Sequence, residues 1–223
     1  MSDLSVFIPR FSGLIKGHRF SVAGFLLFAG CLLTAGPAQA HHAFGGKTPD
    51  SLLTGFLAGL AHPIIGLDHF AFVIAVGLLA AISRQGMMIP IAFALAGLVG
   101  TGIHLQSLDL PAPEFFISAS VLLFGVLLAL KKSPNGMMVV GLGAIAGIFH
   151  GYAYGESIVG AQMTPLVAYL IGFSLIQLAI SLTAYWLGKR MVERGTTQEL
   201  PLRFAGFAIC GIGITLLNAV ILG

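Results

Sequence analysis

The residues best suited to chemistry lie in one short stretch of an apolar segment that runs from about residue 52 to residue 82. His62, Asp68 and His69 fall within eight residues of one another. Two imidazoles and a carboxylate are the ligand types that a first-row divalent cation prefers. An Asp at the centre of a helix in lipid costs roughly 2.5–3.5 kcal/mol on insertion scales, and it needs a partner. The stretch therefore predicts a site built for a charged species.

The same stretch contains two residues that disturb a helix. Pro63 removes the hydrogen-bond donor of the carbonyl four residues earlier, and Gly66 weakens the helix further. In a continuous helix, His62 and His69 would lie about 10 Å apart along the axis, too far to share one ion. Either the break draws the two rings together, or they act as successive stations. Asp68 is either a ligand or a group that orients an imidazole.

A second polar cluster spans residues 149–156, Phe-His-Gly-Tyr-Ala-Tyr-Gly-Glu. His150 and Tyr154 share a helix face, although Tyr154 also suits the interfacial aromatic belt. Glycines at every fourth position form a smooth ridge for close helix packing: Gly143, Gly147, Gly151 and Gly155. The candidate metal ligands of the chain are His62, Asp68, His69, His104, Glu114, His150 and Glu156. Secondary roles are predicted for His41, His42, Tyr154, Pro63 and Gly66.

Each candidate also has a structural explanation. A lone buried histidine is more often a hydrogen-bonded structural residue, which is the reading favoured for His104. Glu114 is a residue favoured in the first turn of a helix by the helix dipole. Helix–helix hydrogen bonds would account for the weaker polar positions Ser174, Gln177, Thr215 and Asn218.

Composition places these residues in a membrane. The 223-residue chain is 57% hydrophobic and only 9% charged, with a mean hydropathy of +0.98. A soluble domain carries about 25% charged residues. We therefore expect an all-α integral membrane protein with one membrane domain and no nucleic-acid partner. The two cysteines suggest no disulfide framework.

The chain divides into three predicted parts. Residues 1–40 resemble a cleavable signal peptide, with Ala38-Gln39-Ala40 as the small-residue cleavage pattern, although an uncleaved anchor is the alternative. Residues 41–51 form a periplasmic N-terminal segment, and residues 52–223 form a six-span domain. The predicted spans are 52–82, 87–106, 113–131, 136–156, 161–188 and 201–222.

Charges in the loops set the orientation. With the mature N-terminus outside, only Lys47 among the basic residues beyond position 40 lies on the outer side. The inner loops then carry Arg84, Lys131, Lys132, Lys189, Arg190, Arg194 and Arg203. This positive-inside pattern predicts a multi-pass protein of the bacterial inner (cytoplasmic) membrane.

The two polar clusters together resemble the HupE/UreJ family of nickel permeases, which is found with hydrogenase and urease genes. The first family signature, His-x5-Asp-His, matches residues 62–69. The second, Phe-His-Gly-x-Ala/Val-x-Gly-Glu, matches residues 149–156 without departure. The resemblance implies import of Ni²⁺, or of Co²⁺, as transported substrate, with no prosthetic group and no enzymatic activity. It also implies that the matched His, Asp and Glu residues are needed for transport.

The expected mechanism is capture and transfer of the cation. The outer residues His104, Glu114, Glu156 and His150 are predicted to capture it and pass it to His62, Asp68 and His69. Two rival readings stay open: a zinc-dependent intramembrane hydrolase, and a metal-binding membrane subunit that does not transport. The sequence also leaves open a homo-oligomer and the choice between Ni²⁺, Co²⁺ and Zn²⁺.

Overall fold

The computed structural model describes residues 47–131, 134–193 and 200–223, and all regular structure in these ranges is helical. The helices are α2 (Leu52–Ile65), α3 (Leu67–Ile82), α4 (Met88–Leu105), α5 (Pro113–Ala129), α6 (Gly136–Glu156), α7 (Met163–Glu193) and α8 (Leu200–Leu222). The predicted signal peptide, together with His41 and His42, lies outside the described residues.

The helices coincide with the six apolar segments predicted from sequence, apart from a few residues at their ends. Four of them, α4, α6, α7 and α8, are long and apolar enough to cross a membrane, and the bent pair α2–α3 makes a fifth candidate. Helix α5 is apolar but has only 17 residues, about 26 Å, slightly short of a hydrocarbon core of about 30 Å. The chain is thus a multi-pass membrane protein, and a sixth crossing at α5 stays a prediction.

Local sequence signals explain where several helices begin. The Ser51 hydroxyl accepts a hydrogen bond from the backbone of Thr54 and caps α2, with a reciprocal bond from the Ser51 backbone to the Thr54 hydroxyl. The Asn135 side chain caps α6 by accepting from the backbone of Met137. Pro113 occupies the first turn of α5, where its missing N–H costs nothing.

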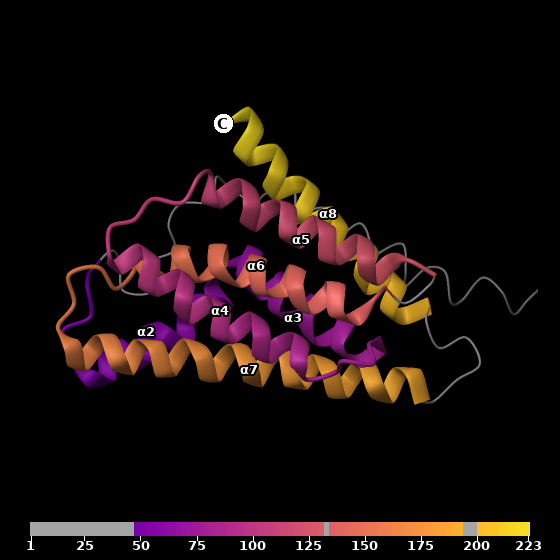
Figure 1. Ribbon diagram of the computed structural model, residues 1–223, viewed down its shortest axis with the longest axis horizontal. Coiled ribbons are helices and arrows are strands. Elements are labelled where there is room, and N and C mark those ends of the chain that lie inside the picture. Colours follow the sequence, from indigo (N-terminus) through magenta and orange to yellow (C-terminus); the bar gives the residue numbers. More distant parts are fainter. Residues whose placement is uncertain (1–46, 132–133, 194–199) are drawn as a thin grey trace, which may run out of the picture. The chain divides into compact units, whose positions relative to one another are not determined.

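Helix α3 is the most enclosed element. Nearly every residue between Ala71 and Ala81 is buried, and α3 packs against all six of the other described helices. Around it, α4 lies along α6, α5 along α8, and α2 along the first half of α7 (Figure 1). Large apolar side chains on the outer faces of α4, α7 and α8 are exposed, as expected for surfaces that contact lipid.

The predicted break in the first apolar segment is present, and it lies at Gly66. Gly66 is extended (φ −73°, ψ 108°), separates α2 from α3 and accompanies a bend of 79°, while Pro63 lies within α2. A Cβ at position 66 would sit 2.7 Å from Cδ2 of His69 and 2.9 Å from Oδ1 of Asp68. The glycine therefore leaves room for two candidate ligands at the bend.

The glycine ridge of α6 packs against α4. A Cβ on Gly151 would collide with the carbonyl of Gly97, and a Cβ on Gly147 would meet the Phe93 carbonyl at 2.5 Å. The Thr101 hydroxyl donates to the Gly151 carbonyl at 2.7 Å and so bonds the two helices. This close approach holds α6, and His150 with it, in a fixed position.

We expect Gly151→Ala to destabilise the folded protein by about 1–3 kcal/mol, because the added methyl group has no space against α4. Thermal unfolding in detergent would measure this loss. Gly141→Ala is the matched control on the same helix, because nothing lies within 4 Å of the added Cβ. Equal melting temperatures for the two variants would show that the ridge does not set the packing.

Candidate metal-binding site

Three histidines from three helices form one buried cluster. His62 comes from α2, His69 from α3 and His150 from α6, and their exposed fractions are 6%, 4% and 0%. The ring centroids of His62 and His69 are 5.6 Å apart, and those of His69 and His150 are 5.0 Å apart. The break at Gly66 therefore draws together two rings that a straight helix would separate.

Aromatic side chains surround this cluster. Phe72 stacks on the ring of His150 with centroids 4.4 Å apart, and Phe93 meets the same ring edge-on at 5.8 Å. The ring of Tyr154 contacts both the His69 ring, with centroids 4.5 Å apart, and the His62 ring, with centroids 5.0 Å apart. The apolar walls lower the local dielectric, so a charge that enters here depends on the cluster for its stabilisation.

Hydrogen bonds fix the tautomers of His150 and His69. The hydroxyl of Ser120 donates its proton to the carbonyl of Ile117 at 2.7 Å, so its oxygen accepts from Nε2 of His150 at 3.0 Å. With neutral imidazoles, Nδ1 of His150 then accepts from Nδ1 of His69 at 2.8 Å. In this arrangement the lone pair of His69 is on Nε2.

The same reasoning applies to His62. The Tyr169 hydroxyl donates to the backbone carbonyl of Tyr154 at 2.8 Å, so its oxygen accepts from Nδ1 of His62 at 3.0 Å. Ser157 also lies 2.9 Å from that nitrogen. Two hydroxyl groups thus hold the His62 ring through Nδ1. Partners that fix the proton on one nitrogen of a histidine are typical of metal-ligating imidazoles.

Asp68 lies at the edge of the cluster, beside His69. Its Oδ1 accepts a hydrogen bond from the backbone N–H of His69 at 2.8 Å, and its Oδ2 lies 3.9 Å from Nε2 of His69. The side chain is 23% exposed. One carboxylate oxygen thus orients the residue, and the other faces the imidazole nitrogen that holds the lone pair.

The predicted convergence of outer residues is only partly present. Glu114 and Glu156 are exposed, and His104 packs against Tyr152 with ring centroids 4.4 Å apart. His150, expected among the outer capture residues, instead contacts His69. Tyr154, assigned a second reading as an interfacial residue, is fully buried.

The three histidine rings lie in a row, and they do not surround a single position that one metal ion could occupy. Within residues 47–131, 134–193 and 200–223, no three His, Cys, Asp or Glu side chains are already arranged to hold one metal ion. His69 lies in the middle and contacts His62 on one side and His150 on the other. Such an arrangement suits passage from one ligand to the next better than permanent retention.

Comparison with known proteins agrees with the two signatures. The family model described as "HupE / UreJ protein" matches residues 29–216. The chain belongs to the HupE/UreJ family. A curated relative in this family, Protein HupE of Rhizobium leguminosarum bv. viciae, is 30% identical over 166 residues, which is 73% of this chain and 84% of the relative. No solved structure shows a significant match.

In this HupE/UreJ chain, sequence reasoning missed the hydroxyl groups that support the histidines. Ser120 lies on α5, Ser157 directly follows α6, and Tyr169 lies on α7. Tyr169 reaches His62 because Gly59 of α2 packs against the Tyr169 backbone. The available signal was weak: a hydroxyl group in an apolar helix at the depth of the histidines.

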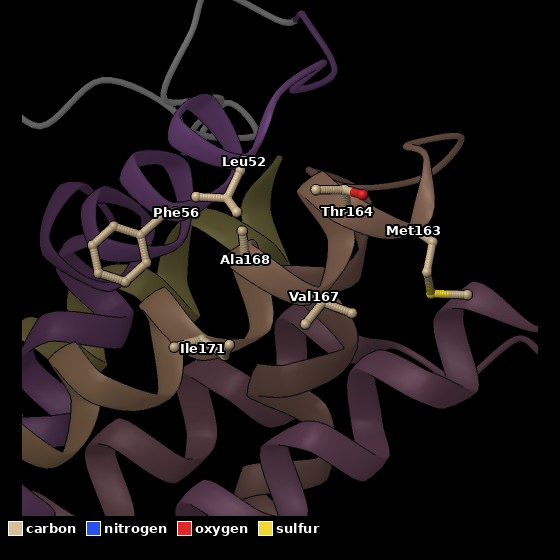
Figure 2. Close-up of a pocket in the computed structure, with 7 residues that line it drawn as sticks. All are labelled: Leu52, Phe56, Met163, Thr164, Val167, Ala168 and Ile171. Atoms are coloured by element: carbon tan, nitrogen blue, oxygen red, sulfur yellow. The ribbon is translucent and has the colours of Figure 1, made fainter.

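A separate cavity of about 390 Å³ lies between the first turns of α2 and α7 (Figure 2). Its lining is almost entirely apolar and consists of Leu52, Phe56, Met163, Thr164, Val167, Ala168 and Ile171. Its lining residues include no His, Cys, Asp or Glu, so the metal ligands predicted from the sequence lie elsewhere and not at this cavity.

Proposed function

We propose that this protein imports a divalent transition-metal ion, most favourably Ni²⁺ and alternatively Co²⁺, across the bacterial inner membrane for metalloenzyme maturation. The observation that carries the proposal is the buried histidine cluster, because it brings imidazoles from three helices into contact beside the Asp68 carboxylate. Membership of the HupE/UreJ family supports the same conclusion. The mature N-terminus would face the periplasm.

The residues of the cluster are of the types that can replace the water ligands of a divalent cation and offset its charge. A bare dication in hydrocarbon is prohibitively unstable, so ligands must replace its lost water molecules. The imidazoles of His62 and His69 would do so, and Asp68 would offset part of its charge. Several weak ligands in sequence allow both entry and release.

The membrane potential supplies enough driving force for accumulation. A divalent cation that moves inward gains about 4.6 kcal/mol per 100 mV of inside-negative potential. This is equivalent to more than about a thousandfold concentration ratio. The proposed import therefore needs no nucleotide hydrolysis by this chain, whose sequence has no G-x-x-x-x-G-K-[ST] phosphate loop.

Uptake of radioactive Ni²⁺ into proteoliposomes tests this function, with a potassium gradient to set the potential and Co²⁺ and Zn²⁺ as competitors. We expect uptake that requires the protein and increases with inside-negative potential. No uptake above that of protein-free liposomes would contradict import by the isolated chain. Retention of one Zn²⁺ per chain, together with turnover of a lipid amide or ester, would instead support the hydrolase reading.

Tyr154 supplies a further prediction about this site. Its hydroxyl is buried and has no hydrogen-bond partner within residues 47–131, 134–193 and 200–223, although its ring contacts His62 and His69. We infer that this hydroxyl binds the passing ion or its water. Tyr154→Phe should therefore reduce uptake about tenfold, within the range that supporting residues of metal sites show.

Tyr152→Phe is the matched control, because it removes the same atom from the same helix. The Tyr152 hydroxyl lies 3.5 Å from Asp109, outside the histidine cluster. Initial rates of Ni²⁺ uptake should stay near wild type in this variant. Equal rates for Tyr154→Phe and Tyr152→Phe would remove the Tyr154 hydroxyl from the pathway.

A further inference from the structure

A second polar group without partners lies in the core on α7. Gln177 is 1% exposed, and neither its amide oxygen nor its amide nitrogen has a hydrogen-bond partner among the described residues. The hydroxyl of Ser174, three residues earlier, is buried without a partner as well. The sequence-based explanation by helix–helix hydrogen bonds is therefore wrong for both residues. Buried amide groups are rarely left unpaired, so this position calls for a functional explanation.

The packing of α7 against α3 gives the depth of Gln177. The two helices run in the same direction, because Gly77 packs against the Ser181 backbone and Gly188 packs against Ala81. Gly77 lies two turns beyond His69, about 12 Å along α3, and Gln177 lies one turn before Ser181, about 6 Å. Gln177 is therefore about one helical turn inward of His69.

Aromatic residues connect this position to the histidine cluster. Along α7, Tyr169 contacts His62, Phe173 packs against Tyr154 with ring centroids 5.2 Å apart, and Gln177 follows one turn later. Both Phe173 and Tyr169 are fully buried. Tyr169, Phe173 and Gln177 thus share one buried face of α7, with Phe173 one turn from each of the two polar residues.

We propose that Gln177 and Ser174 form a second binding station for the transported divalent cation, on the cytoplasmic side of the histidines. This inference rests on the proposed import function. The amide oxygen of Gln177 and the hydroxyl of Ser174 are neutral oxygen ligands for the partly hydrated ion. Neutral oxygen holds a late first-row dication less tightly than imidazole and carboxylate do, so the station favours release toward the cytoplasm.

Gln177→Leu separates this role from a structural one. Replacing an unpaired buried amide by an apolar group of similar size is expected to leave the melting temperature unchanged or raised. We expect the variant to import Ni²⁺ about tenfold more slowly than wild type in proteoliposomes. Its Ni²⁺ affinity in detergent, measured by calorimetry, should stay within about twofold because the histidine cluster is untouched.

Two further variants complete the experiment. Thr183→Val is the matched control, since the Thr183 hydroxyl is on the exposed side of α7 and donates to the Ala179 carbonyl at 2.7 Å. Gln177→Met replaces the amide by an unbranched side chain and serves if Gln177→Leu does not fold. Wild-type uptake in either folded Gln177 variant would overturn the inner station and leave import intact. An inactive wild-type chain would overturn the proposed function, and the inner station with it.

Discussion

His69→Ala is expected to reduce Ni²⁺ uptake in proteoliposomes by at least about 100-fold, the upper end of what even supporting residues of metal sites cost. His69 contacts both His62 and His150, so its loss divides the cluster into two separate imidazoles. It also removes the proton donor for Nδ1 of His150.

His150→Ala should produce a similar loss, because Ser120 and His150 together set the tautomer of His69. The double variant should be no worse than either single variant, since residues that act as a unit are strongly non-additive. Protein amount in the membrane and melting temperature serve as folding controls. A folded His69→Ala protein that keeps more than a tenth of wild-type uptake would show that the cluster does not carry the ion.

Asp68→Asn is expected to nearly abolish uptake while the protein remains in the membrane. The substitution preserves shape, and the Asn oxygen can still accept from the His69 backbone, as Oδ1 of Asp68 does at 2.8 Å. It removes one negative charge beside the ion. At an effective dielectric of about 20, a unit charge about 4 Å from a dication contributes several kcal/mol, which corresponds to more than a hundredfold in binding.

Asp50→Asn is the matched control for the charge. The Asp50 carboxylate accepts a hydrogen bond from the Thr54 hydroxyl at 3.2 Å and is exposed before α2, outside the histidine cluster. Initial uptake rates should stay near wild type in this variant. Full transport by Asp68→Asn would assign Asp68 a purely local role, as the group that orients His69.

The helices themselves could be predicted from the sequence because each apolar segment ends at clear signals. Arg84 and Lys131 follow the ends of α3 and α5, and Pro113 and Asn135 mark two helix starts. The two signatures likewise predicted His62, His69 and His150 as candidate metal ligands. Helix periodicity and composition are local properties, so a single sequence contains them.

The assembly of the site could not be predicted in the same way. A bend of 79° at Gly66 decides whether His62 and His69 meet, and no residue type specifies that angle by itself. Ser120 and Tyr169 reach the histidines from α5 and α7, which depends on how helices distant in sequence pack. Glu114 and Glu156 lie near helix ends, and the sequence does not show which way a helix is rotated about its axis. Helix packing decides this, and it leaves both side chains exposed.

The bend at Gly66 also has a mechanical consequence. His62 lies on α2 and His69 on α3, and the single extended residue Gly66 joins the two helices. Helix α6, by contrast, is held against α4 by close packing at its glycines. A small hinge rotation at Gly66 would change the spacing of the first two imidazoles and leave the frame around His150 in place. A larger side chain at position 66 is therefore expected to change the distance between the rings of His62 and His69.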